Sequence, residues 1–176
     1  MLFDLEKHSA KMSAREMAPQ RLEDRQRDIY DSHRHRVFSV SCYMTGNEIE
    51  AEEILRSAFV RAFRSASEPD HAVIDTALVQ ELRDQQVLRT DDQLPAPDTG
   101  FLPPRHNILR TELEEAIRYL PSAERLVFLL MDVEGYSAHR VAELLHMSDA
   151  LVLRTALTAR LRLRAELASL SKPQAA

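Results

Sequence analysis

The residues of this chain best suited to chemistry are its seven histidines and its acidic pairs, which in other settings serve as metal ligands or as general acids and bases. Their spacing fits neither role. His33 and His35 lie two apart on an expected helix and so point in different directions, and Cys42 has no second cysteine to join it as a ligand. Glu52 and Glu53 diverge in the same way, and no glycine-rich phosphate loop is present. The sequence therefore predicts no enzyme, no metal site and no cofactor.

Arginines near the C-terminal end offer a different chemistry, the binding of phosphate groups. They are Arg154, Arg160, Arg162 and Arg164. On a helix that starts at Ser148, a step of about 100° per residue points them away from the apolar stripe that would pack on the rest of the domain. Because the whole chain has a formal net charge of -5, any contact with nucleic acid must come from such a local basic patch.

The elements that must position these arginines form a helix-turn-helix. Residues 120–164 read as three consecutive helices with short turns, and a serine stands near each expected start. A serine hydroxyl accepts a hydrogen bond from an unpaired N–H of the first helical turn, so we expect Ser122, Ser137 and Ser148 to be N-caps. The short turn at 146–147 is typical of a helix pair that presents its second member to DNA.

On this interpretation the residues facing DNA lie on the last two of these helices. They are His139, Arg140, Ser148, Arg154, Thr155, Thr158, Arg160 and Arg162. The inner, core-facing stripe of the last helix is expected to consist of Val152, Ala156, Ala159 and Leu163. Side chains able to read base edges are scarce at the start of this helix, so we expect it to contact phosphates more than bases.

The last helix carries a second apolar stripe, roughly 120° from the first. It consists of Leu153, Leu157 and Leu161. A contiguous patch of exposed leucines usually marks an interface, so we expect burial against a partner protein. The alternative is that the domain's own core uses all of this apolar surface.

The N-terminal part of the chain predicts a two-helix hairpin. A helix from about Leu22 to Thr45 keeps one side apolar and is stopped by Gly46, and Asn47 can cap the next helix. In that second helix apolar residues recur at three- and four-residue steps, namely Ala51, Ile54, Leu55, Ala58, Phe59, Ala62 and Phe63. The residues before the hairpin are expected to form a loose arm, because Pro19 should prevent a clean continuation of the helix.

A third helix is expected from Asp70 to Leu88, and Thr111 is expected to cap a short helix through Leu120. Between them, prolines and a glycine in 90–107 forbid regular structure and mark a domain boundary. The predicted fold is all-α, with two small helical domains joined by a Pro-rich linker. Its parts are an N-terminal arm (1–21), a first domain (22–89), the linker (90–107), a second domain (108–168) and a tail (169–176).

The segment LPSAERLVFLLMDVEGYSAHRVAELLHMS resembles the promoter-reading region 4 of sigma-70-class factors, especially the small extracytoplasmic-function (ECF) group. The segment IYDSHRHRVFSVSCYMTGNEIEAEEILRSAFVRAFR resembles region 2 of the same family. There the second helix clamps onto a coiled coil of the largest RNA polymerase subunit. The matching polymerase-binding positions are Glu50, Glu52, Glu53 and Arg56. Favourable placement of acids near a helix N-terminus is the alternative explanation of the glutamates.

The expected third helix departs from the family. The resemblance implies that this segment opens and reads the minus-ten promoter element, which requires aromatic side chains on unpaired bases and basic side chains on phosphates. The stretch HAVIDTALVQELRDQQVLRTDD contains no Phe, Tyr or Trp, and acids surround Arg83 and Arg89. We therefore expect a degenerate DNA-reading surface.

The resemblance implies an ECF-type sigma factor that directs core RNA polymerase to promoters, with core RNA polymerase, promoter DNA and an anti-sigma factor as partners. No apolar run is long enough to span a membrane, and the charged start does not fit a signal peptide, so we expect a cytoplasmic protein. The alternative is a sigma-like regulator that sequesters an anti-sigma factor, or occupies polymerase without melting a promoter. A stand-alone helix-turn-helix repressor is less favoured, because it needs no polymerase clamp.

Overall fold

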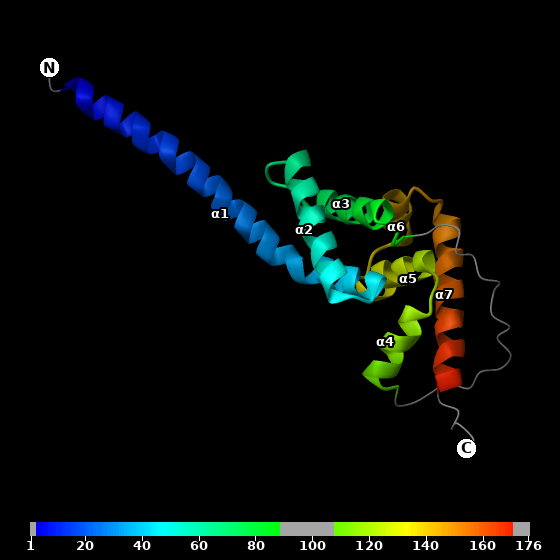
Figure 1. Ribbon diagram of the computed structural model, residues 1–176. Coiled ribbons are helices and arrows are strands. Elements are labelled where there is room, and N and C mark those ends of the chain that lie inside the picture. The colour runs from blue at the N-terminus through cyan, green and yellow to red at the C-terminus, as the bar shows by residue number, and fades with distance from the viewer. Residues whose placement is uncertain (1–2, 89–107, 171–176) are drawn as a thin grey trace.

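The computed structural model describes residues 3–88 and 108–170, with side chains from residue 21 onward (Figure 1). Every regular element in these ranges is a helix, which confirms the all-α fold class. The N-terminal half contains α1 (Phe3–Thr45), α2 (Glu48–Ser65) and α3 (His71–Asp84). The C-terminal half contains α4 (Arg110–Arg118), α5 (Ser122–Phe128), the π-helical turn η1 (Leu129–Val133), α6 (Ala138–Leu145) and α7 (Asp149–Leu170). The predicted linker and residues 171–176 of the predicted tail lie outside the described residues.

Helix α1 is continuous from Phe3 to Thr45, so the break expected at Pro19 is wrong. A proline inside a helix costs roughly 3 kcal/mol, because it removes an N–H donor and its ring crowds the preceding turn. The neighbouring sequence offsets this cost, since AKMSAREMAPQRLEDRQR consists largely of strong helix formers. Gly46 ends the helix with a φ of +71°, as the sequence predicts.

The caps of the next two helices explain where they begin. Asn47 Oδ1 accepts a hydrogen bond of 2.9 Å from the Ile49 N–H, which confirms the predicted cap of α2. Asp70 caps α3 in the same way, through the Val73 N–H at 2.9 Å. Helix α3 is shorter than predicted, because Gln86 takes a left-handed conformation with a φ of +55° and ends the helical run.

Two predicted caps in the C-terminal half are wrong. Helix α4 begins before Thr111, with Leu109 as N-cap, because the Glu112 carboxylate turns back to accept the Leu109 N–H at 3.0 Å. Helix α5 has Pro121 at its N-cap, and Ser122 is its first helical residue. Pro121 has no N–H of its own, and no side chain at the N-cap bonds the first turn of the helix.

The caps of the helix-turn-helix are confirmed. Ser137 Oγ accepts from the Arg140 N–H and Ser148 Oγ from the Leu151 N–H, both at 3.2 Å. Between α6 and α7 the chain turns at His146, whose φ of +56° is left-handed. These caps and this turn fix where α7 starts relative to α6.

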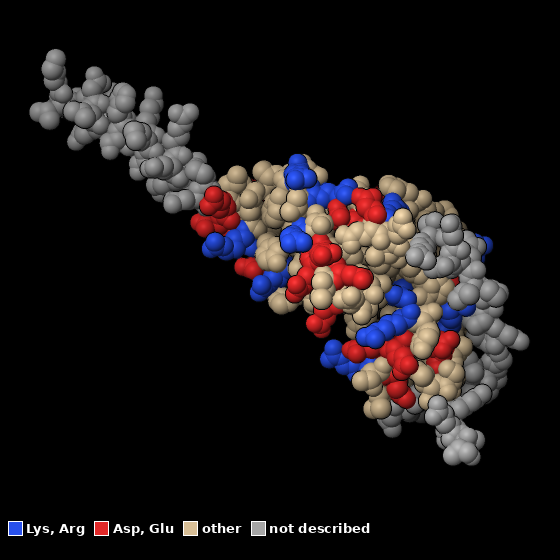
Figure 2. All heavy atoms as spheres, in the orientation of Figure 1, with Lys and Arg blue, Asp and Glu red and all other residues tan. Residues whose placement is uncertain are grey.

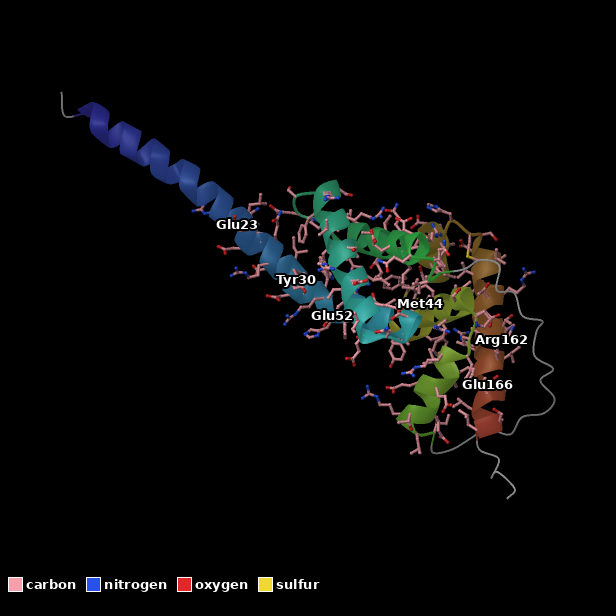
Figure 3. All side chains as sticks on the ribbon, in the orientation of Figure 1. Glu23, Tyr30, Met44, Glu52, Arg162 and Glu166 are labelled. Atoms are coloured by element: carbon pink, nitrogen blue, oxygen red, sulfur yellow. The ribbon has the colours of Figure 1, made fainter. Side chains whose placement is uncertain are left out.

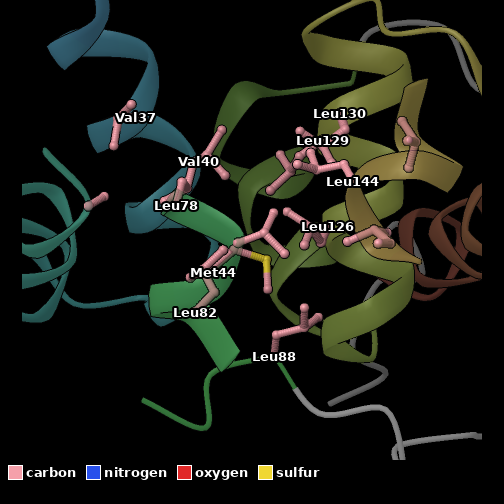
Figure 4. Close-up of a cluster of buried hydrophobic side chains, with 14 of the residues drawn as sticks. Val37, Val40, Met44, Leu78, Leu82, Leu88, Leu126, Leu129, Leu130 and Leu144 are labelled. Carbon is pink, nitrogen blue, oxygen red and sulfur yellow. The ribbon is translucent and has the colours of Figure 1, made fainter. Parts of the chain in front are cut away.

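One apolar core is shared by the two halves, as the close-up in Figure 4 shows. The N-terminal half contributes Val37, Val40, Met44, Leu78 and Leu82 among others. The C-terminal half contributes Leu126, Leu129, Leu130 and Leu144 among others. Each of these side chains is at least nine-tenths buried. The N-terminal and C-terminal halves are therefore packed directly on one another.

A smaller apolar cluster joins α4 to α7, formed by Ala116, Ile117, Leu120, Ala159, Leu163 and Leu167. All four residues of the predicted inner stripe of α7 are buried in these two clusters, which confirms that stripe. Neither α7 nor any other described helix has the length and apolar character needed to cross a membrane.

Candidate functional site

A groove of about 890 Å³ runs along the outer face of the hairpin of α1 and α2, and we call it the α1–α2 groove. Its apolar lining includes Tyr30, Phe38, Ile49, Phe59, Val60 and Phe63. The rings of Tyr30 and Phe59 meet edge to face with centroids 4.8 Å apart, and Phe63 stacks against Phe59 at 6.0 Å. An aromatic floor of this kind suits the apolar face of a partner helix.

Charged residues of α2 form the edge of the α1–α2 groove. Of the predicted polymerase-binding residues, Glu52, Glu53 and Arg56 line it, and all three are exposed. Figure 3 shows Glu52 on α2 and Tyr30 on the neighbouring α1. Glu50 is exposed but lies outside the groove, where its carboxylate accepts a hydrogen bond of 3.3 Å from Asn47 Nδ2.

The helix dipole explains only part of this acidic edge. Glu48 and Glu50 lie in the first turn of α2, where a negative charge is favourable. The effect falls off beyond that turn, so it does not account for Glu52 and Glu53. The acidic residues of α2 also affect Cys42: burial raises the pKa of its thiol, and the nearby charges of Glu48 and Glu52 raise it further.

On α6, the predicted DNA-facing residues already have acidic partners. His139 lies 3.6 Å from Glu143 and 3.3 Å from Asp149, measured between ring nitrogen and carboxylate oxygen. Arg140 lies 3.6 Å from Glu143 and 3.9 Å from the buried Asp75 of α3. These neighbours offset much of the positive charge that α6 would offer to a phosphate backbone.

The arginines of α7 divide into three kinds. Arg162 is only 8% exposed and forms a two-pronged ion pair with Glu124 of α5, at 2.8 and 3.0 Å. Its predicted place among the DNA-facing residues is therefore wrong. Arg160 is exposed but paired with Asp132 at 2.8 Å. Arg154 and Arg164 are exposed, and no ion pair to either is seen within the described residues. The basic patch of α7 thus has fewer exposed, unpaired arginines than the sequence predicts.

The hydroxyl residues of α7 are used within the helix. Ser148 is its cap. Thr155 and Thr158 donate to the carbonyl oxygens of Leu151 and Arg154, at 2.9 and 3.0 Å. Their contact with DNA stays a prediction, and these hydroxyls would have to exchange a backbone partner for a phosphate to make it.

The second apolar stripe of α7 lies largely in solvent. Leu153 is 54% exposed and Leu157 is 55% exposed, while Leu161 is half-buried. The domain's own core therefore does not use this surface, and a covering partner stays a prediction. Exposed apolar side chains adjacent on one helix face are typical of a protein-binding surface.

Helix α3 turns its apolar face inward, as predicted, with Ile74, Ala77, Leu78 and Leu82 buried. Its exposed side presents His71, Thr76, Gln80 and Asp84. Asp84 and the mostly buried Glu81 both bind Arg61 of α2, at 2.5 and 2.6 Å. This exposed surface offers no aromatic platform for an unpaired base.

Sequence reasoning missed a polar cluster around the buried Asp75, where the two halves meet. Asp75 of α3 lies within bonding distance of Arg36 of α1 and Tyr136 of the C-terminal half. A signal was present, because Asp75 falls between Ile74 and Ala77 on a helix face that is otherwise apolar. A charge on such a face predicts a buried partner.

Charged side chains are mixed over the surface shown in Figure 2, where acidic and basic groups lie side by side. This pattern agrees with the net charge of -5 and with the ion pairs of α6 and α7. Within the described ranges, no group of three or more His, Cys, Asp or Glu side chains is placed to hold a metal ion.

Comparison with known proteins agrees with this architecture. Residues 110–163, from the start of α4 to near the end of α7, match the family model "Sigma-70, region 4". The chain is 25% identical over 129 residues to the ECF RNA polymerase sigma factor SigE of Mycolicibacterium smegmatis. That match covers 65% of this chain and 50% of the relative, so the chain spans about half the length of the curated relative it matches.

A solved structure shares the fold of both halves. It is the sigma factor RpoE in complex with the anti-sigma factor NepR from Bartonella quintana. The TM-score is 0.56 at 16% sequence identity, and the match covers 88% of this chain and 98% of that one. The solved structure shows the fold, while the region 4 match and the SigE relative show that the chain is similar to the ECF group of sigma-70-class RNA polymerase sigma factors.

Proposed function

We propose that this protein is a sigma factor that binds core RNA polymerase through the α1–α2 groove and directs it to promoters through α6 and α7. It acts in the cytoplasm, where RNA polymerase and DNA are found, and it has no catalytic activity of its own. Its DNA-reading surface is weak, because few basic residues of α6 and α7 are free of acidic partners.

The observation that carries this proposal is the α1–α2 groove on the same chain as a capped helix-turn-helix. The groove joins an aromatic floor to Glu52, Glu53 and Arg56, the positions that match the polymerase clamp of the family. A repressor that contacts only DNA has no use for such a surface. A protein that brings polymerase to a promoter needs both a polymerase-binding surface and a DNA-binding helix-turn-helix.

The decisive experiment is transcription with purified core polymerase on genomic DNA, followed by sequencing of the RNA 5′ ends. We expect discrete start sites that depend on this protein. Polymerase binding without any dependent start site would refute the promoter-directing role and leave only the binding role.

Charge reversal tests the groove itself. Glu52→Lys and Glu53→Lys together should abolish co-purification with core polymerase, because they invert the charge on the edge of the groove. The matched control reverses Glu23 and Glu115, which are exposed acids that do not line the groove. If the groove variant still co-purifies with core polymerase and its circular dichroism is unchanged, Glu52 and Glu53 only stabilise helix α2 and do not bind polymerase.

A second function is favoured by the surface of α3 and by the exposed Leu153 and Leu157. A sigma-like regulator would keep the polymerase clamp or the partner-binding stripe and lose promoter melting. In that case an anti-sigma factor would cover the stripe, as the energetics of exposed leucine suggest. The transcription experiment separates the two functions, because only the first yields dependent start sites.

A further inference from the structure

An exposed carboxylate stands at the start of α7, the second helix of the helix-turn-helix. Asp149 is the first residue of α7, and its side chain is 55% exposed. In this motif the N-terminal residues of the second helix face the base edges in the major groove. Of the residues that follow, Leu151 is half-buried, Val152 is buried, and the exposed Ala150 has no polar group in its side chain. Because Ser148 already caps the helix, Asp149 is the side chain of the first turn best placed to bond a base.

A histidine of α6 fixes the direction of this carboxylate. His139 Nδ1 lies 3.4 Å from Asp149 Oδ1 and 3.3 Å from Asp149 Oδ2. Carboxylate oxygens only accept hydrogen bonds, so this contact places a proton on Nδ1. The other ring nitrogen lies 3.6 Å from Glu143, one turn along α6, which helps to hold the ring. The contact joins the two helices, so it orients the Asp149 side chain relative to α6 as well as to α7.

A carboxylate discriminates between bases by the groups that each base presents in the major groove. Cytosine presents its N4 amine, which is a donor. Adenine places its N6 amine beside the N7 acceptor, and that acceptor repels a carboxylate. Guanine presents O6 and N7 and thymine presents O4, which are all acceptors. The base that fits the Asp149 carboxylate best is therefore cytosine.

The helix dipole offers a simpler explanation of Asp149, because an acidic residue in a first turn is favourable. That explanation has a consequence for DNA binding. A carboxylate that only stabilises the helix would repel the phosphate backbone and weaken binding to every sequence. A carboxylate that accepts from a base would instead favour the sequences that present the donor. The two explanations therefore predict different results when the charge of Asp149 is removed.

We propose that Asp149 selects cytosine at one position of the DNA element read by α7, and that His139 is the positioning residue that directs its carboxylate. This inference rests on the DNA-directing part of the proposed function and not on polymerase binding. It also changes the expected role of His139, which acts through Asp149 and does not bind a phosphate itself.

The test is the selection of bound duplexes from a random-sequence DNA pool, with the full-length protein alone and in complex with core polymerase. We expect one position at which cytosine is preferred over guanine or thymine about tenfold, which is about 1.4 kcal/mol. Asp149→Asn keeps nearly the same shape and removes the charge. Because an asparagine amide pairs with N6 and N7 of adenine, this variant should prefer adenine at the same position and leave the other positions unchanged.

Glu143→Gln is the matched control, because it removes the same charge beside the same histidine without changing the first turn of α7. It should keep the cytosine preference. His139→Leu should remove most of that preference, and His139→Gln, which keeps an N–H donor, should restore most of it. The three substituted positions are exposed, so each variant should fold, which circular dichroism checks.

Equal strengthening of binding to all sequences by Asp149→Asn would overturn the proposal and leave only the helix dipole to explain Asp149. An unchanged cytosine preference in His139→Leu would overturn the positioning role. If the polymerase complex selects a sequence with no position sensitive to Asp149→Asn, the inference fails and the proposed function stands. If neither the protein nor the complex selects any sequence, the DNA-directing function fails, and the inference fails with it.

Discussion

The ion pair between Arg162 and Glu124 yields a sharp prediction, because the sequence predicts Arg162 as a DNA-facing residue and the structure buries it. Replacing Arg162 by alanine should destabilise the C-terminal half. The same change at Arg154, which is exposed, should leave stability within about 0.5 kcal/mol. The two variants therefore separate a structural arginine from a DNA-contacting one on the same helix.

The size of the effect follows from the geometry of the pair. The Arg162 and Glu124 side chains are 9% and 12% exposed, and both prongs of the guanidinium bond the carboxylate. Removing one partner of a buried pair leaves an uncompensated charge, at a cost of about 3–5 kcal/mol. Replacing both by apolar residues, Arg162→Met with Glu124→Leu, should recover most of that loss, because no charge is then left buried.

Urea unfolding of Arg162→Met, of Glu124→Leu and of the double variant measures the coupling of the pair as a double-mutant cycle, and Arg162→Ala and Arg154→Ala are unfolded in the same way. Binding of a DNA fragment by the folded variants gives the second readout. We expect Arg162→Ala to lower the urea midpoint strongly, and Arg154→Ala to weaken DNA binding at an unchanged midpoint. An unchanged urea midpoint for Arg162→Ala, together with weakened DNA binding, would refute the idea that Arg162 stabilises the fold and would make it a DNA-binding residue.

Three further predictions concern charge, the apolar stripe and pH. Within the described residues, Arg154 and Arg164 are the exposed arginines of α7 for which no ion pair is seen, so DNA binding should involve two or three phosphates. Log K should then fall with log salt at a slope of roughly -2 to -3, at about -0.9 per contact, and a much steeper slope would mean that other residues bind DNA. Leu153→Lys with Leu157→Gln should weaken binding of an anti-sigma factor about 10- to 100-fold in calorimetry, because burying the exposed half of each leucine is worth roughly 0.75–1.5 kcal/mol. If the double variant instead fails to fold, the stripe belongs to the core. Burial and the nearby charges of Arg36 and His71 lower the pKa of His33 from 6.5, and Asp75 opposes them. The contribution of neutral His33 to the free energy of unfolding should therefore be complete above about pH 6.5 and be lost as the pH falls below it. His33→Gln should flatten this dependence in urea midpoints measured at pH 7.5 and 5.5.

Local features were the most predictable from the sequence. The caps at Asn47, Ser137 and Ser148 follow from hydrogen bonds within one helical turn, and the inner stripe of α7 follows from its period. Interactions of this range depend on neighbouring residues, so the sequence contains them directly. The exposed positions of Glu52, Glu53 and Arg56 on α2 follow from helical period in the same way, whereas the groove that they line also needs Tyr30 and Phe38 of α1.

Tertiary context decided the features that the sequence misplaced. Arg162 lies one residue from Leu163, at an angle on α7 that periodicity alone assigns to the helix surface. Helix α5 packs against that flank and brings Glu124 within 2.8 Å, so the surface becomes interior. Helix α1 continues through Pro19 for a local reason instead, because the summed helical preference of the neighbouring residues outweighs one unfavourable residue.

The composition of α3 affects both its outer surface and the packing between the halves. A helix whose outer surface reads unpaired bases needs aromatic and basic side chains there, and its inner side must be purely apolar to pack in its own domain. Helix α3 has neither property, because its exposed surface carries no aromatic side chain and because Asp75 on its inner side bonds Arg36 and Tyr136 instead of packing in the core. A buried carboxylate is costly unless partners compensate it. Arg36 belongs to α1 of the same half, whereas Tyr136 reaches Asp75 only when the C-terminal half is docked. Asp75 therefore helps to seat the helix-turn-helix on α3, while the missing aromatic side chains make the outer surface of α3 a poor platform for unpaired bases.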